Sequence, residues 1–291
     1  MTEPFTDAHV HFWDHALPGM RWRFLEPDFD HPRLKGTQRL DAPRFGPEEL
    51  LAEADGERPY KIVHVQCALQ PLPHPTQETD WLDTLADADG FPNAIVAGCR
   101  LREPHAADVL EANAASPRFR GVRDLSVATA VEPGDVRVAF DAASEYGASV
   151  ELMLPMEHYG SVARLAEVWP DVTIVLGHAG QPLARDPDYL RAWSKALGEL
   201  ASRAPNVVLK LSAIASSADP NWTVDSLRSC ALPAIEALGA DRCMFASNWP
   251  IDRLYGTYPR LIAAYRQIAA ELSARESAAV LHATADQVYQ I

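Results

Sequence analysis

The chain has 291 residues, of which 47% are hydrophobic and 8% aromatic, a composition typical of a globular protein with a large core. Its formal net charge of −14 argues against nucleic-acid binding, because proteins that bind nucleic acid present basic faces. No segment is long and apolar enough to span a bilayer, and the N-terminus has no basic segment followed by an apolar one. We therefore expect one cytoplasmic domain over residues 1–291, without membrane or nucleic-acid partners.

The first apolar run ends in two histidines separated by one residue, His9 and His11. Alternate side chains of a β-strand project from the same face, so we expect these imidazoles to share one side with Asp7. Such a pair is suited to holding a metal ion or a reacting group. Two polar residues that only bond to the backbone at a strand end would give the same pattern, so the rest of the chain has to decide.

After a proline- and aromatic-rich stretch over residues 17–46, short apolar segments alternate with segments of helical periodicity. Further strands are predicted at 60–67, 94–99, 119–125, 149–154, 172–176, 207–211 and 242–247. Helices are predicted at 77–89, 106–114, 135–146, 159–168, 189–202, 224–238, 259–272 and 275–289.

Eight strands that alternate with helices indicate a parallel α/β sheet, and the chain length fits a (β/α)₈ TIM barrel of about 250 residues plus insertions. The alternative is an open doubly wound sheet. That fold often has a glycine-rich turn after its first strand, where this chain has histidines. In a barrel, the 17–46 stretch would be a long loop over the active-site face.

Polar side chains gather at the predicted C-terminal ends of the strands, where barrel enzymes carry their functional groups. Beyond the first strand they are His64, Gln66, Arg120, Arg123, Glu151, Glu157, His158, His178, Lys210, Ser212, Asn248 and Asp252. This concentration exceeds what solvated loops need and predicts an active site.

Several of these residues also have a purely structural interpretation. His178 could cap a turn, and Arg123 could pair with a neighbouring carboxylate such as Glu151. Lys210 lies in an apolar strand, which predicts a buried ion pair, and His64 is typical of a core histidine with satisfied hydrogen bonds. The four cysteines show no paired spacing and are expected to be reduced core residues.

Other catalytic signatures are absent from the sequence. There is no G-x-S-x-G elbow, H-E-x-x-H motif, Walker-type loop or Cys-x-x-Cys pair. Hydrolase or lyase chemistry built from histidines and a carboxylate remains, with or without a metal.

Four segments, in this order, resemble the amidohydrolase-related family: residues 9–14 (HVHFWD), 175–182 (VLGHAGQP), 207–212 (VVLKLS) and 244–250 (MFASNWP). They are most similar to its branch of TIM-barrel hydrolases, which includes sugar lactonases and 2-pyrone-4,6-dicarboxylate lactonase. The resemblance extends over essentially the whole chain and implies a barrel that opens a lactone ring by water attack. It also implies that His9, His11 and His178 line the site. Some members bind a divalent metal there, usually zinc, and others work without one.

The sequence departs from this family at the eighth strand. The family commonly has an aspartate directly after the serine of that strand, as general base and metal ligand, and this chain has Asn248. An amide is no base at neutral pH and binds zinc poorly. Either Asp252 takes the role, or a histidine is the base, or the activity is lost.

We predict a hydrolase that opens a lactone or a related cyclic ester of an anionic or polyhydroxylated small molecule. The three histidines polarise the carbonyl, directly or through one zinc or manganese ion, and Asp252 or Asn248 handles the attacking water. The residues expected to contact substrate are Arg123, His31, Gln66 and Trp249.

Two other functions stay open, a metal-dependent non-oxidative decarboxylase of an unsaturated or aromatic acid, and a barrel that binds a small molecule without catalysis. The seven tryptophans leave room for an apolar interface in a homo-oligomer.

Overall fold

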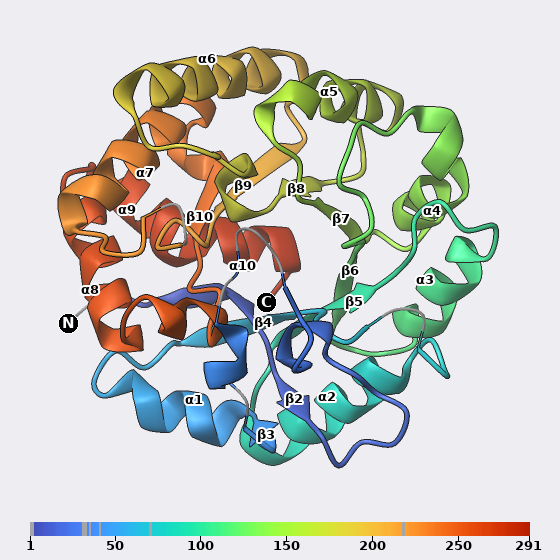
Figure 1. The fold of residues 1–291 in the computed structure, drawn as a ribbon. Helices are drawn as coiled ribbons and strands as arrows, with labels where there is room; N and C mark the ends of the chain where they lie inside the picture. The colour runs from blue at the N-terminus through green and yellow to red at the C-terminus, as the bar shows by residue number, and fades with distance from the viewer. Residues whose placement is uncertain (1–2, 31–33, 35, 41, 70–71, 217–218) are drawn as a thin grey trace.

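The computed structural model describes residues 3–30, 34, 36–40, 42–69, 72–216 and 219–291, and its centre is a barrel of parallel strands (Figure 1). The strands pair in chain order and are β1 (Thr6–Val10), β4 (Lys61–Val65), β5 (Ala94–Gly98), β6 (Phe119–Arg123), β7 (Ser149–Leu152), β8 (Ile174–Leu176), β9 (Val207–Leu211) and β10 (Cys243–Phe245). A parallel bridge between Val10 and Trp249 joins the chain after β10 to β1. The predicted (β/α)₈ TIM barrel is confirmed.

Helices follow the strands and form an outer ring (Figure 1). They are α1 (Pro47–Ala54), α2 (Gln77–Asp89), α3 (Ala106–Ala114), α4 (Pro133–Glu145), α5 (Tyr159–Val168), α6 (Pro187–Arg203), α7 (Val224–Leu238) and α8 (Tyr258–Ala269). Capping side chains explain where two of them begin. Asp186 accepts from the Tyr189 amide before α6, and Thr223 accepts from the Ser226 amide before α7.

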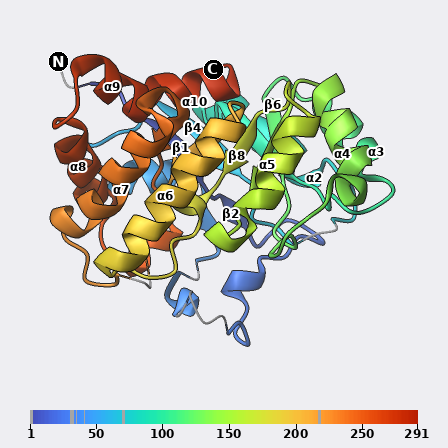
Figure 2. The ribbon, with the colours of Figure 1, turned by 90° about the horizontal axis from the view of Figure 1, so that it is seen from above.

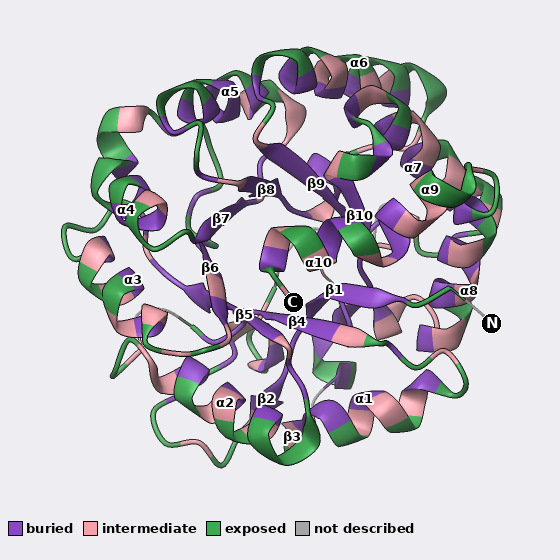
Figure 3. Cartoon of the chain, turned by 180° about the vertical axis from the view of Figure 1, so that it is seen from behind, coloured by how far each residue is buried: buried purple, intermediate pink, exposed green. Residues whose placement is uncertain are grey.

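The last predicted helix, at 275–289, is divided into three parts. These are α9 (Ala274–Ala278), a π-helical turn η7 (Ala279–Ala283) and α10 (Thr284–Tyr289). Asp286 of α10 accepts from the Thr6 hydroxyl at 2.7 Å and pairs with Lys61 at 2.8 Å, at the first residues of β1 and β4. Figures 1 and 3 show α10 near the barrel axis. The helix therefore covers the N-terminal end of the barrel, and the C-terminal strand ends lie at the opposite mouth.

The barrel interior is apolar over most of its length, and Figure 3 shows its strands as buried. Alternate residues of a barrel strand face inward, where they pack in layers. The inward cluster consists of Ala8, Val63, Val65, Ala94, Val96, Val175, Val208, Met244 and Ala246, together with Ala285 and Tyr289 of α10. A larger apolar core lies between the strands and the surrounding helices.

The stretch between β1 and α1 has more regular structure than its sequence indicates. β2 (Trp13–Asp14) pairs antiparallel with β3 (Arg44–Phe45), and two short 3-10 helices, η1 (Arg23–Leu25) and η2 (Thr37–Leu40), lie between them. Figure 2 shows this stretch extending from the barrel end opposite to α10, where the long loop was predicted. Two-residue strands carry no periodicity, and α1 has only eight residues, so neither was predicted. His31 falls outside the described residues, and its substrate contact stays a prediction.

The remaining short 3-10 helices are η3 (Met156–His158), η4 (His178–Gly180), η5 (Ala240–Arg242) and η6 (Ile251–Leu254). All four cysteines are free and buried, as their spacing predicted. Within the described ranges, no helix is both long enough and apolar enough to cross a membrane.

Gly121 of β6 provides a test of how tightly the barrel is packed. A Cβ atom at this position would lie 2.2 Å from the Ser149 hydroxyl and 2.7 Å from the Ser149 carbonyl oxygen. We expect Gly121→Ala to lower the free energy of unfolding by about 1–3 kcal/mol, the usual cost of overpacking. The control is Gly134→Ala in α4, where nothing lies within 4 Å of the added Cβ. Urea denaturation of both variants checks this, and equal midpoints would contradict it.

Candidate active site

His9 and His11 meet at the C-terminal end of β1, and both are buried. Their Nε2 atoms lie 3.2 Å apart, and their rings are edge-on with centroids 4.8 Å apart. The Nδ1–H of His11 donates to the Val65 carbonyl at 2.7 Å, which leaves its Nε2 without a proton when the ring is neutral. The predicted pairing of these two imidazoles is present in the structure.

Asp7 does not share this side, contrary to the expectation from strand alternation. Its carboxylate accepts from the Ser247 amide at 2.9 Å and from the Tyr258 hydroxyl of α8, outside the barrel, at 3.0 Å. The register between β1 and β4 shifts between Asp7 and Val10, so the simple alternation is interrupted there. Asp7 ties β1 to the chain after β10 and to the helical ring.

Burial lowers the pKa of both imidazoles well below the ordinary histidine value. For His9, the neighbouring charge of Lys210 acts in the same direction, and for His11 that of Arg123 does. Both rings are therefore neutral at neutral pH. A neutral imidazole has one N–H and one nitrogen lone pair, and because His11 uses its N–H on Val65, its Nε2 offers the site a lone pair.

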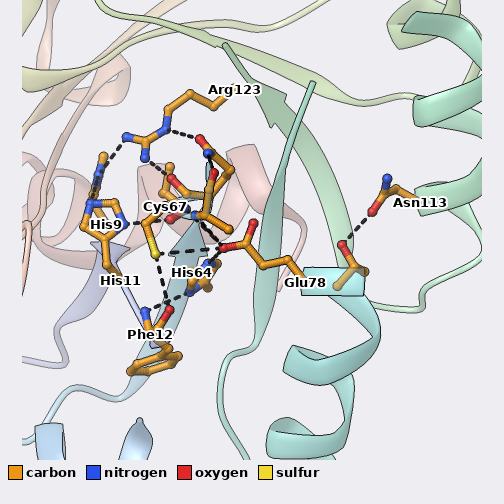
Figure 4. A network of polar contacts seen from close by, with 12 residues as sticks. His9, His11, Phe12, His64, Cys67, Glu78, Asn113 and Arg123 are labelled. Atoms are coloured by element: carbon orange, nitrogen blue, oxygen red, sulfur yellow. Dashed lines mark hydrogen bonds and ion pairs between the residues drawn. The ribbon is translucent and has the colours of Figure 1, made fainter. Parts of the chain in front are cut away.

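Arg123, the last residue of β6, places a guanidinium group against this pair (Figure 4). It is buried and donates to both the backbone carbonyl and the side-chain oxygen of Gln66, the latter at 3.4 Å. Its Nη1 lies 3.4 Å from His9 Nε2. Because the guanidinium group stays protonated in proteins, the site holds a fixed positive charge beside neutral imidazoles.

His178 joins the cluster from the end of β8. Its ring centroid lies 4.8 Å from that of His9, and its Nδ1 lies 2.9 Å from the Ser212 hydroxyl at the end of β9. His9, His11 and His178 therefore come from distant parts of the chain to one place, as predicted.

The backbone around His178 is in an unusual conformation. Four successive residues, His178–Gln181, have φ between 52° and 63°, in the left-handed region that residues other than glycine rarely adopt. The Tyr159 hydroxyl donates to the Gly180 carbonyl at 2.8 Å, and the Trp193 indole donates to the Ala179 carbonyl at 3.2 Å. Strained backbone of this kind concentrates at functional sites, where the surrounding structure holds it.

Asn248 and Asp252 form a second buried pair, after β10. The Asn248 amide donates to Asp252 Oδ1 at 2.8 Å, and Asp252 Oδ2 has no hydrogen-bond partner among the described residues. Burial raises the pKa of Asp252 well above the ordinary value, while the bond from Asn248 counteracts this. Asn248 adjoins Trp249, whose carbonyl accepts from the His11 amide at 2.8 Å, so the backbone holds the pair next to β1.

The side chain of Trp249 is directed away from the histidine cluster. Its indole donates to Glu53 of α1 at 2.8 Å and lies edge-on to the Tyr258 ring of α8, with centroids 5.5 Å apart. These contacts lie between the barrel and its helical ring. The structure does not bring this side chain together with the other predicted substrate residues.

A second cluster lies next to His11 and consists of His64, Cys67 and Glu78 (Figure 4). Glu78 accepts from the Cys67 amide at 3.2 Å and from the Ala68 amide at 3.1 Å, and it lies 3.4 Å from His64 Nε2. Although burial acts to raise the pKa of Glu78, hydrogen bonds from His64 and these amides bring it below the ordinary value.

The backbone of Phe12 makes hydrogen bonds to two members of this cluster. The Phe12 amide donates to His64 Nδ1 at 3.3 Å, and the Cys67 thiol donates to the Phe12 carbonyl at 3.3 Å. Burial raises the pKa of that thiol well above its usual range, so it is protonated where no metal is bound. The cluster connects the ends of β1 and β4 to α2.

Lys210 and Glu151 form the buried ion pair that the apolar strand around Lys210 predicted, with Nζ 2.7 Å from Oε1. The Tyr289 hydroxyl of α10 donates to the same oxygen at 2.6 Å. Burial lowers the pKa of Lys210 to about 8, against the opposing effect of Glu151. Sequence reasoning missed Tyr289, because nothing in a C-terminal helix indicates that it enters the barrel.

A family profile described as amidohydrolase matches residues 6–291. The chain belongs to the amidohydrolase family. An uncharacterised protein of Sinorhizobium fredii, y4mH, is 31% identical over 98% of both chains. A protein of Burkholderia ambifaria named L-fucono-1,5-lactonase is 29% identical over 87% of this chain and 82% of its own.

Solved structures share the amidohydrolase barrel. An amidohydrolase from Burkholderia multivorans with bound zinc has a TM-score of 0.80 at 24% identity, with 99% of both chains covered. A putative 2-pyrone-4,6-dicarboxylic acid hydrolase from Pseudomonas putida has a TM-score of 0.69 at 18% identity, with 100% of this chain and 98% of that chain covered. The 5-carboxyvanillate decarboxylase from Sphingomonas paucimobilis has a TM-score of 0.63 at 17% identity, with both chains fully covered. At these identities the likeness concerns the fold.

The residues present do not fit a resident metal ion in this amidohydrolase. Zinc with Zn–N distances of about 2.0–2.1 Å holds two nitrogens about 3.3 Å apart, close to the 3.2 Å between His9 and His11. Among the described residues, however, no ligand atom of a further histidine, cysteine or carboxylate lies within 4.8 Å of the ligand atoms of both His9 and His11. The residue that follows Ser247 is Asn248, whose amide binds zinc poorly, and Arg123 brings a positive charge to within 3.4 Å of His9 Nε2.

The raised pKa of Asp252 has a measurable consequence for stability. Because the pKa of the Asp252 carboxyl is raised in the folded protein, its contribution to stability is fully present below the pKa of an unfolded aspartate, about 3.9. This contribution is lost as the pH rises through the pKa of the folded protein. We expect Asp252→Asn to be more stable than the native amidohydrolase near pH 7, with the difference shrinking toward pH 4. Denaturation midpoints across this range test it. The exposed Asp225→Asn serves as control, and a gap independent of pH would contradict the expectation.

Proposed function

We propose that this amidohydrolase hydrolyses a lactone of a polyhydroxylated acid. The observation that carries the proposal is the convergence of His9, His11 and Arg123 on one buried point at the barrel mouth, with His178 beside them. The relatives named L-fucono-1,5-lactonase support the same reaction class.

Arg123 acts on the substrate carbonyl as a hydrogen-bond donor, with the neutral imidazoles beside it. When water adds to a lactone, negative charge develops on the carbonyl oxygen, and donors already held in place stabilise it without reorganising. The bonds from Arg123 to Gln66 hold the guanidinium group in this way. Loss of one such donor typically lowers kcat by about 10²–10³.

Asp252 is the general base in this mechanism. Asn248 occupies Oδ1, so Oδ2 accepts the proton of the attacking water. Burial raises the pKa of the carboxyl above its ordinary value, which makes it a stronger base than an exposed aspartate. Water oxygen bonds to the carbonyl carbon, the ring C–O bond breaks, and the leaving oxygen takes the proton back from Asp252. The product is the open hydroxy acid.

The charge distribution favours a neutral, polyhydroxylated substrate over a dicarboxylate. Among the described residues, the fully buried cations are Arg123 and Lys210. Lys210 is paired with Glu151, and the Arg123 donors are directed at Gln66 and His9. A single guanidinium charge does not neutralise two substrate carboxylates.

Hydrolysis of a lactone panel tests this function. We expect turnover of five- and six-membered aldonolactones, measured by acid release, and little turnover of 2-pyrone-4,6-dicarboxylate. His178→Ala and Asp252→Asn should each lower kcat at least about a hundredfold, on the scale of a lost donor or base. His282→Ala, a histidine paired with Glu3 far from the cluster, is the control. A twofold loss in His178→Ala would remove His178 from the mechanism, and CO₂ release from an aromatic acid would favour a decarboxylase instead.

Because Arg123 supplies the positive charge, we expect activity without a bound metal. Elemental analysis of the purified protein should find substoichiometric zinc and manganese, and prolonged chelation should leave kcat unchanged. About one equivalent of either metal, with activity lost on chelation and restored by the ion, would instead assign it to His9, His11 and His178.

A further inference from the structure

The contact between Ser212 and His178 joins the C-terminal ends of β9 and β8 at the barrel mouth. Ser212 directly follows β9 and is fully buried. His178 meets its hydroxyl oxygen twice, because the His178 amide donates to Ser212 Oγ at 3.3 Å and the ring nitrogen Nδ1 lies 2.9 Å from the same atom. One hydroxyl group therefore contacts both the backbone and the ring of His178.

The hydrogen of the Ser212 hydroxyl decides which ring nitrogen of His178 is protonated. Buried side-chain hydroxyls are nearly always hydrogen-bonded. The His178 amide is itself a donor, and among the described residues the Ser212 hydroxyl has no acceptor other than His178 Nδ1. The hydroxyl therefore donates to Nδ1. Because Nδ1 then bears the lone pair, the ring carries its hydrogen on Nε2.

His11 has the opposite arrangement in the same site. Its Nδ1–H donates to the Val65 carbonyl at 2.7 Å, which leaves the lone pair on Nε2. The difference comes from the partner, since a carbonyl oxygen only accepts, whereas the Ser212 hydroxyl accepts from an amide and donates to the ring. Two side chains of the same type thus offer a lone pair and an N–H group.

The backbone on both strand ends is held in an unfavourable conformation at this contact. His178 and Ala213, the residue after Ser212, both have φ of 52°, in the left-handed region. Residues other than glycine keep such a conformation where the surrounding structure imposes it, and these residues concentrate at functional sites. In this conformation the amide and the ring of His178 reach one oxygen atom.

We propose that Ser212 is a positioning residue that fixes His178 as an N–H donor, and that His178 Nε2–H and Arg123 together stabilise the negative charge on the substrate carbonyl oxygen. Both groups lie beside His9, with His178 at 4.8 Å between ring centroids and Arg123 Nη1 at 3.4 Å from His9 Nε2. Donors held in place before the reaction stabilise such a charge without reorganising. The inference rests on the proposed function for the identity of this charge.

Ser212→Ala tests the inference, with Ser149→Ala as the matched control. Ser149 is also a buried serine of the barrel, but its hydroxyl donates to the Arg120 backbone carbonyl at 3.1 Å. We expect Ser212→Ala to lower kcat for an aldonolactone about tenfold to a hundredfold with KM within about twofold. Loss of a donor costs about 10²–10³ in kcat, and the ring in this variant still spends part of its time in the Nε2–H form. Ser149→Ala should leave both constants unchanged.

Nitrogen-15 NMR of the histidine rings gives a readout that is independent of catalysis. The ¹⁵N shifts of a neutral ring separate the protonated from the unprotonated nitrogen, and the His178 signals are identified by their absence in His178→Ala. We expect the hydrogen on Nε2 in the native protein and in Ser149→Ala, and at least partly on Nδ1 in Ser212→Ala. A hydrogen on Nδ1 in the native protein, or an unchanged Nε2–H form in Ser212→Ala, would overturn the inference.

Failure of the proposed function would be distinguishable from failure of this inference. If the protein hydrolyses no lactone, the proposed function fails, and the NMR signals still decide whether Ser212 fixes the His178 ring.

A serine beside a histidine is also the arrangement of a nucleophile activated by a base. Mass spectrometry of the protein quenched during lactone turnover separates the two roles. We expect no added mass, because Ser212 Oγ is fully buried and accepts from the His178 amide. An acyl group on Ser212 that is absent in Ser212→Ala would contradict the positioning role.

Discussion

Barrel closure is the constraint on which the active site depends. β1 and β10 are separated by more than 200 residues, and the hydrogen bond from the His11 amide to the Trp249 carbonyl joins the chain at their ends. This bond sets the distance between the first-strand histidines and the Asn248–Asp252 pair. Asp7 adds a second connection, through the Ser247 amide. A substitution that weakens these two hydrogen bonds would move the first-strand histidines relative to the Asn248–Asp252 pair.

The electrostatics of the site follow from where each charge is placed relative to solvent. Burial keeps the imidazoles neutral, whereas the guanidinium group keeps its proton under the same conditions. A fixed cation beside neutral imidazoles forms an environment that favours a developing negative charge. Under the proposed mechanism, Arg123 supplies the positive charge that a metal ion supplies in many other hydrolases.

The repeating elements of the barrel could be predicted from the sequence, whereas local departures from the repeat could not. Alternating periodicity predicted the eight strands and their order, and the His9–His11 spacing predicted two convergent imidazoles. Strand alternation failed for Asp7, because a register shift depends on the neighbouring strand and leaves no local signal. The outward direction of Trp249 and the entry of Tyr289 into the barrel depend on tertiary packing, which spacing along the chain does not encode. Burial, and with it the pKa of Asp252, is likewise a property of the assembled fold.

The position of α10 also determines how molecules reach and leave the site. Among the described residues, this helix and Tyr289 fill the N-terminal end of the barrel, which leaves the opposite mouth as the way to the histidines. Under the proposed reaction, substrate, water and the ring-opened acid would share that mouth, past the segment that contains β2 and β3. The product would be an anion leaving past Arg123, so its departure and the arrival of the next substrate would exclude each other. Product would then compete with substrate for the site, and turnover would depend on how fast ligands pass through this mouth.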